Sequence, residues 1–309
     1  MIDVFFKTVP FFALIATGYW AGRTRFFPEE ATAYLTKFVF YFALSAMLFR
    51  FSANLSLAQV WDANLVTGYL VGTFAVYAIA TTVGMLRGQN VATTAVEAQC
   101  AAIGNIGFLG IPMLALLLGE KSVGIIMMAL AVDLIVFSSL IVILITGSRD
   151  GRFSFGILKT IALGLFKNPM ILAISTGLIW SALEIPIPTP MNDFLSILGG
   201  AATPGALFAI GASLASRSAE RLSVAGWLSF CKLILHPAFV AIGVLYLFPV
   251  DPYTAAVVIS ASALPVAGNV YILAQHYGVA PQRVSATILV STAISIVTVS
   301  AIIATVSPH

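Results

Sequence analysis

Two short segments that combine helix-breaking with hydrogen-bonding residues interrupt two long apolar runs. Residues 104–112 read GNIGFLGIP, and residues 263–269 read ALPVAGN. In hydrocarbon a broken helix frees backbone N–H and C=O groups that find no water, so breaks persist where they are buried in protein or line a wet cavity. Matched breaks in the two halves of a chain are the best sequence indication of a transporter's binding site.

The chemistry that such breaks offer is anion binding. The half-helix after each break begins with unpaired N–H groups and a partial positive charge. Asparagine amides add hydrogen bonds and glycines allow close approach to the backbone. One break is equally well explained as a proline or glycine kink in a packed helix, but two matched breaks favour a site. The predicted substrate-binding residues are Asn105, Gly107, Gly110, Pro112, Pro265, Gly268 and Asn269.

Four ionisable residues lie inside apolar runs: Glu97, Asp133, Lys232 and His236. A charge in mid-bilayer costs at least about 3 kcal/mol, so such groups face protein or water and usually pair. Lys232 and His236 are four residues apart on one helical face, and Asp133 lies at a similar depth, which suggests an Asp133–Lys232 pair. The group would either couple transport, as a proton relay or in place of a sodium ion, or lock neighbouring helices together. The structural role is slightly favoured.

The composition identifies a membrane protein. Hydrophobic residues make up 60% of the chain and charged residues 9%, against roughly 25% charged in soluble domains. No basic stripe suits nucleic acid, and Cys100 and Cys231 are expected to be buried free thiols. The sequence contains no hydrolase, P-loop or CxxC motif, and His236, His276 and His309 are far apart. We therefore expect no enzyme activity, no metal and no cofactor.

The apolar runs predict ten transmembrane helices in two sets of five. The predicted spans are 4–22, 32–52, 64–86, 94–118, 122–147, 169–185, 193–215, 224–248, 254–276 and 283–306. The first repeat is then 1–147, the second is 169–309, and a cytoplasmic connector covers 148–168. Within the connector, 156–167 suits a short amphipathic surface helix, with a plain connector as the alternative. Both breaks fall in the fourth span of a set, and an odd number of spans per repeat makes the repeats inverted.

The loop charges predict that both termini lie outside a cell (inner) membrane. With that orientation the outer gaps hold Arg50 and Lys121, whereas the cytoplasmic gaps hold Arg23, Arg25, Arg87, Arg149, Arg152, Lys159, Lys167, Arg217, Arg221 and Arg283. The bias satisfies the positive-inside rule. A missed span would scramble this alternation, so the bias also supports the predicted number of spans.

The motif at residues 104–112 resembles the fourth-span motif of the auxin efflux carrier family. That family includes bacterial transporters of malonate and related organic acids and the plant auxin carriers. Further similar segments are 167–169 (KNP), 203–204 (TP), 209–214 (AIGASL), 232–237 (KLILHP) and 264–265 (LP) with Asn269. The resemblance extends over essentially the whole chain.

The resemblance implies an all-α fold with crossed broken helices 4 and 9, shared distantly with the sodium/bile acid symporters. It also implies a scaffold of spans 1, 2, 6 and 7, a mobile transport domain of spans 3–5 and 8–10, elevator-type movement and a homodimer. Asn105, Pro112, Pro265 and Asn269 would then lie beside the substrate.

The sequence therefore predicts a secondary transporter of small organic anions, such as mono- or dicarboxylates, that works by alternating access in a lipid bilayer. A sodium-coupled symporter of the bile-acid type is the alternative, and Lys232 argues against it because an ammonium takes up cation space. An anion receptor without net flux and an intramembrane enzyme are less favoured.

Overall fold

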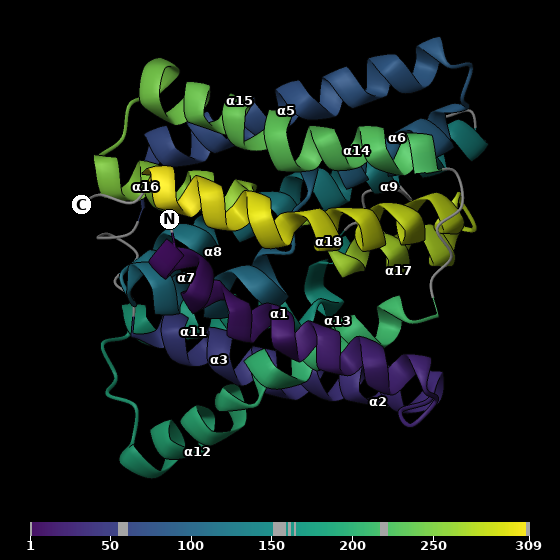
Figure 1. Cartoon of the computed structure of the whole chain (residues 1–309). Helices are drawn as coiled ribbons and strands as arrows, with labels where there is room; N and C mark the ends of the chain where they lie inside the picture. Colours follow the sequence, from purple (N-terminus) through teal and green to yellow (C-terminus); the bar gives the residue numbers. More distant parts are fainter. Residues whose placement is uncertain are drawn as a thin grey trace.

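The chain folds into helices joined by short connections (Figure 1). The computed structural model describes residues 2–54, 61–150, 159, 162–163, 165–216 and 222–306. The predicted all-helical class is confirmed. Half of the predicted connector helix at 156–167 lies outside the described residues.

Within the described part of the chain, six continuous helices are long and apolar enough to cross a membrane. This confirms a multi-pass membrane protein. Two of the six are single α-helices, α5 (Ala63–Leu86) and α18 (Pro281–Val306). The others join shorter elements: α2 (Glu29–Phe38), η1 (Val39–Ala43) and α3 (Leu44–Ala53); α8 (Ser122–Val132), η3 (Asp133–Phe137) and α9 (Ser138–Asp150); α12 (Thr189–Gly200) and α13 (Ala202–Leu214); and α14 (Leu222–Phe230), η4 (Cys231–Leu235), α15 (His236–Ile242) and η5 (Gly243–Leu247).

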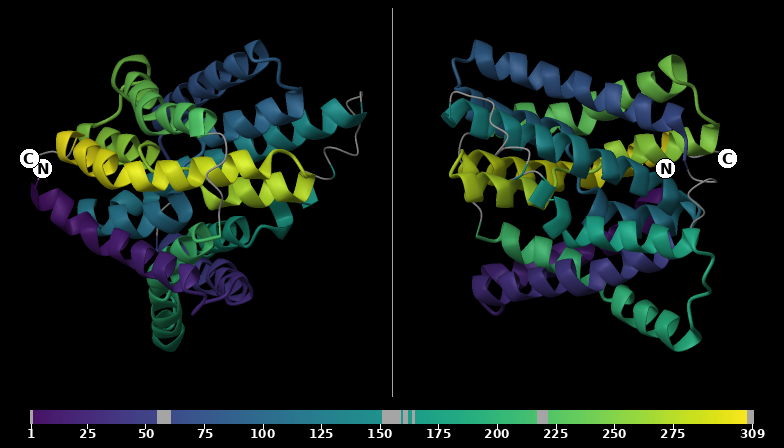
Figure 2. Two further views of the ribbon diagram at one scale, coloured as in Figure 1. Left: turned by 45° about the vertical axis from the view of Figure 1, so that its right-hand side comes forward. Right: turned by 180° about the vertical axis from the view of Figure 1, so that it is seen from behind.

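The two predicted breaks are present as breaks in the helices. The first separates α6 (Val91–Ala102) from η2 (Ile106–Gly110) and α7 (Ile111–Leu118), and the second separates α16 (Pro252–Ser262) from α17 (Gly268–Tyr277). The remaining helices are α1 (Ile2–Arg23) and α11 (Pro169–Ala182). The start of α1 and the end of α18 lie at the same end of the molecule in both views of Figure 2.

The η elements are π-helical turns, and two of them precede prolines that lie in the first turn of the next α-helix. Pro112 follows η2 and Pro237 follows η4. A proline has no N–H and its ring clashes with the carbonyl four residues earlier, which in these helices belongs to Phe108 and Leu233. The wider π turn relieves that clash, and π turns are frequent at functional sites.

Close helix packing joins α1 to α13 on one side of the molecule (Figure 1). A Cβ at Gly22 would lie 2.7 Å from the carbonyl oxygen of Ala212, and a Cβ at Gly18 would strike the carbonyl oxygen of Phe208. Gly18 and Gly22 are four residues apart, the spacing of close contacts in membrane helices. On the same side α3 packs against α11 and α12.

Replacing Gly18 with alanine should lower stability by about 1–3 kcal/mol, because the added methyl group meets backbone that cannot yield. Thermal unfolding of the purified protein in detergent measures the effect. Gly226→Ala in α14 is the matched control, since a Cβ there meets nothing within 4 Å. Equal melting temperatures for the two variants would contradict the described packing.

Candidate functional site

The structure brings the two helix breaks together. Gly104 and Val266 form an isolated antiparallel bridge. The backbone N–H of Asn105 donates to the carbonyl of Pro265 at 2.8 Å, and the N–H of Ala267 donates to the carbonyl of Ile103 at 3.2 Å. We call the two paired segments, residues 103–105 and 265–267, the break pair. Each break therefore satisfies backbone groups that the other frees.

Neighbouring groups satisfy more of the backbone at the break pair. The N–H of Val266 donates to the hydroxyl of Ser291 in α18 at 3.2 Å. The carbonyl of Asn105 accepts from the N–H groups of Leu109 at 3.1 Å and Gly110 at 3.0 Å. The first N–H groups of η2 and α17 receive no side-chain cap from the residues that precede them, Asn105 and Ala267. Those helix starts remain available to an acceptor.

Open space lies beside the start of α17. A Cβ built on Gly268 would meet nothing within 4 Å. The neighbouring Asn269 carries a buried Oδ1 that has no hydrogen-bond partner among the described residues. An amide can present either its oxygen or its NH₂ group, because the two orientations have the same shape. A ligand at this position would meet helix N–H groups and an amide that is free to donate.

The other predicted binding residues are packed more tightly. A Cβ on Gly107 would lie 2.6 Å from Met170 Cε of α11, and a Cβ on Gly110 would lie 2.6 Å from Leu264 Cδ1. Pro265 is buried and contributes its carbonyl to the break pair, whereas Pro112 is half-buried in the first turn of α7. Asn105 is 5% exposed. These residues surround the break pair, and the open side is at Gly268.

Lys232 lies directly behind the break pair and is fully buried. Its Nζ donates to the carbonyl of Ser262, the last residue of α16, at 2.5 Å and lies 2.8 Å from His236 Nδ1. A Cβ on Gly104 would be 3.2 Å from Nζ. The other ring nitrogen of His236, Nε2, is 2.9 Å from Thr73 Oγ1 of α5. The predicted closeness of Lys232 and His236 is confirmed.

The predicted pair of Asp133 and Lys232 is not a salt bridge, and the two side chains interact only through space. Among the described residues, no ion pair includes either side chain. Asp133 Oδ1 instead accepts from the hydroxyl of Tyr69 at 2.9 Å, and its buried Oδ2 has no hydrogen-bond partner. The ring of Tyr69 lies 5.9 Å from that of His236. The hydrogen-bond donor to the carboxylate of Asp133 is therefore Tyr69 and not Lys232.

Glu97 has two arginine partners that the sequence analysis did not identify. It is 1% exposed and pairs with Arg87, at the end of α5, and with Arg283, in the first turn of α18. A buried carboxylate needs such compensation, since an unpaired charge is costly. This arrangement ties the end of α5 and the start of α18 to the middle of α6 and favours the structural role for Glu97.

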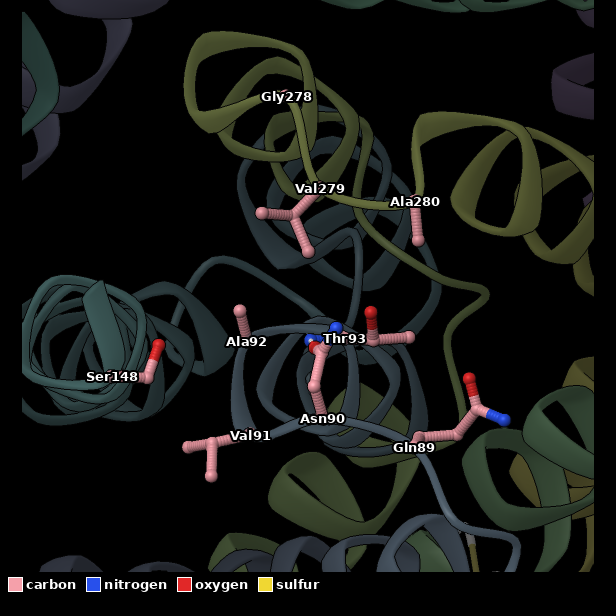
Figure 3. Close-up of a pocket in the computed structure, with 9 residues that line it drawn as sticks. All are labelled: Gln89, Asn90, Val91, Ala92, Thr93, Ser148, Gly278, Val279 and Ala280. Carbon is pink, nitrogen blue, oxygen red and sulfur yellow. Dashed lines mark hydrogen bonds between the residues drawn. The ribbon is translucent and has the colours of Figure 1, made fainter.

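A cavity of about 650 Å³ is lined by no residue of the break pair (Figure 3). It is bounded by the first turn of α6, the end of α9 and the turn between α17 and α18. Its lining is Gln89, Asn90, Val91, Ala92, Thr93, Ser148, Gly278, Val279 and Ala280. None of these side chains is charged, and none is a predicted binding residue. The cavity lining therefore offers an anion no positively charged side chain, and the break pair remains the candidate site.

The apolar helices and the paired breaks with a buried lysine behind them define the class, a multi-pass membrane transport protein. The chain belongs to the family described as "Membrane transport protein", whose model matches residues 3–303. The resemblance to the auxin efflux carrier family is thereby confirmed. A protein of Rhizobium meliloti (strain 1021) named "Putative malonate transporter" is 29% identical over 310 residues, which cover 98% of this chain and 96% of the relative. The chain is a transporter and not an enzyme.

Glu97→Gln should lower stability by about 2 kcal/mol, because it leaves two arginines without their counter-charge. The loss stays moderate because Arg87 and Arg283 both reach solvent. Thermal unfolding of the purified protein measures this loss of stability, with Glu120→Gln at an exposed position as the control. A Glu97→Gln protein as stable as the control variant would contradict a stabilising role for the ion pairs of Glu97 with Arg87 and Arg283.

Proposed function

We propose that the protein is a secondary transporter of small organic anions, mono- or dicarboxylates, that works by alternating access. The observation that carries the proposal is the uncapped start of α17 with open space at Gly268. The amide of Asn269 lies beside it with its Oδ1 unpartnered, and the reverse amide orientation offers its NH₂ group to an anion. The relative named "Putative malonate transporter" is consistent with a dicarboxylate. A family match alone does not choose a ligand.

In this proposal the substrate carboxylate accepts hydrogen bonds from the first N–H groups of α17 and from the amides of Asn269 and Asn105. The positive end of the helix favours the anion. Gly107, Gly110, Pro112 and Pro265 fix the backbone around it. The buried ammonium of Lys232, on the other side of Gly104, adds a positive charge close to the site. A substrate with one carboxylate satisfies these donors, and a second carboxylate would need a further partner.

We propose that the transport cycle uses the inverted-repeat architecture. The repeats are 1–147 and 169–309, each with five spans, and the broken fourth and ninth spans cross at the break pair. Spans 1, 2, 6 and 7 form a scaffold that also makes a homodimer, while spans 3–5 and 8–10 move as an elevator. The packing of α1 on α13 and of α3 on α11 supports one compact set of helices. The shared end of the two termini and the loop charges support an even number of spans with both ends outside.

A sodium-coupled symporter of the bile-acid type is not favoured. Lys232 already places a positive charge behind the break pair, where its Nζ takes the carbonyl of Ser262. A second cation next to it would be repelled, since like charges a few ångströms apart in a poorly polarisable interior interact strongly.

Asn269→Ala should weaken binding of malonate about 10- to 100-fold, because it removes one hydrogen bond to a charged group, worth about 1.5–3 kcal/mol. The thermal shift of the purified protein with a panel of mono- and dicarboxylates measures binding, and uptake into proteoliposomes measures transport. Asn54→Ala, at an exposed asparagine after α3, is the control.

The Asn105→Ala/Asn269→Ala double variant should fold and fail to transport. A folded double variant with full transport would contradict the site. A wild-type protein that no carboxylate stabilises would contradict the substrate class and leave the family assignment unchanged.

A further inference from the structure

The surroundings of Lys232 have the chemistry of a cation site. The Nζ atom meets a backbone carbonyl at the C-terminal end of α16, where the unpaired carbonyls of a helix carry a partial negative charge. It also meets an imidazole nitrogen, His236 Nδ1, at 2.8 Å. Carbonyl oxygens and neutral imidazole are both common cation ligands in proteins. Both ligands are held on buried helices, so the site is formed before any ion arrives.

The contacts of His236 fit a cation at Nζ of Lys232. The Nδ1 atom lies 2.8 Å from Nζ and 3.0 Å from the carbonyl oxygen of Ser262, which also accepts from Nζ. An ammonium donates hydrogen bonds and cannot accept them, so with Lys232 charged Nδ1 offers it a lone pair. In that tautomer Nε2 carries the ring proton and donates to Thr73 Oγ1 at 2.9 Å.

A buried carboxylate interacts with Lys232 through space. Asp133 is 2% exposed, and its Oδ2 has no hydrogen-bond partner among the described residues. Tyr69 donates to the other oxygen, Oδ1, and its ring lies tilted beside that of His236. A buried carboxylate oxygen without a donor is costly unless a positive charge compensates it. Lys232 is the positive charge that can do so through space.

We propose that Lys232 is a tethered cation, whose ammonium permanently fills a monovalent-cation site built by the Ser262 carbonyl, His236 Nδ1 and the charge of Asp133. The ammonium neutralises the end of α16 and lies against Gly104, so it holds the two breaks together. It also gives the organic-anion site a fixed positive charge without a dissolved ion. This last role rests on the proposed function, whereas the cation site itself does not.

A tethered cation differs from an ordinary buried lysine because its charge, and not only its stem, stabilises the fold. If its stem merely fills space, a methionine of similar length should replace it. If the charge is required, Lys232→Met and Lys232→Ala should both be destabilised when no small cation is present. Only Lys232→Ala leaves room for an ion, so only that variant should respond to one.

Thermal unfolding of purified wild type, Lys232→Ala and Lys232→Met tests this in choline, sodium and ethylammonium chloride at equal ionic strength, with no organic acid present. The wild type should melt at the same temperature in all three salts. Lys232→Ala should melt lower in choline and recover by a few degrees in sodium or ethylammonium, because binding to the folded state raises stability. Lys232→Met should melt lower and respond to neither cation. Lys37→Ala, at an exposed lysine, is the control and should respond to neither.

Two results would overturn the tethered cation. One is a folded Lys232→Ala that ignores both sodium and ethylammonium. The other is a wild-type protein that sodium stabilises over choline, and this comparison decides the matter even if Lys232→Ala does not fold. Because no carboxylate is present, the outcome is independent of whether the protein carries organic anions. A separate thermal shift of Lys232→Ala with malonate, with and without sodium, then tests the role of the charge in anion binding.

Discussion

Hydrocarbon offers no hydrogen-bond partner to a backbone amide or carbonyl, and the centre of this protein is arranged around that constraint. The break pair solves it, since Asn105 donates to Pro265 and Ala267 donates to Ile103. A serine of α18 takes the N–H of Val266. With those groups satisfied, the uncapped starts of η2 and α17 are left as the polar groups that a ligand can use.

The same low-dielectric surroundings require each buried charge to have compensating groups nearby. Glu97 is compensated by two arginines at the ends of neighbouring helices. Lys232 contacts a helix terminus and an imidazole, and it interacts with Asp133 only through space. The first arrangement fastens helices, while the second places a positive charge next to the break pair. Together with the positive start of α17, that charge makes the region suited to anions and unsuited to a second cation.

Much of this could be predicted from local sequence, because helix breakers in apolar runs and charges inside spans are visible without a structure. The residues that these side chains contact could not be predicted from the sequence. Tyr69 meets Asp133 across 64 positions, and Thr73 meets His236 across 163. One contact of Lys232 is with a backbone carbonyl, which any residue type provides. Arg87 and Arg283 were counted as loop charges, although they pair with the buried Glu97; Gly107 and Gly110 pack against side chains that sequence spacing does not reveal.

An experimental structure of the purified protein with bound malonate tests the central claim most directly. The account predicts the dicarboxylate beside Gly268 and Asn269, with one carboxylate on the first N–H groups of α17. Malonate bound instead in the cavity between the start of α6 and the turn at Gly278, with the region of Gly268 empty, would contradict it.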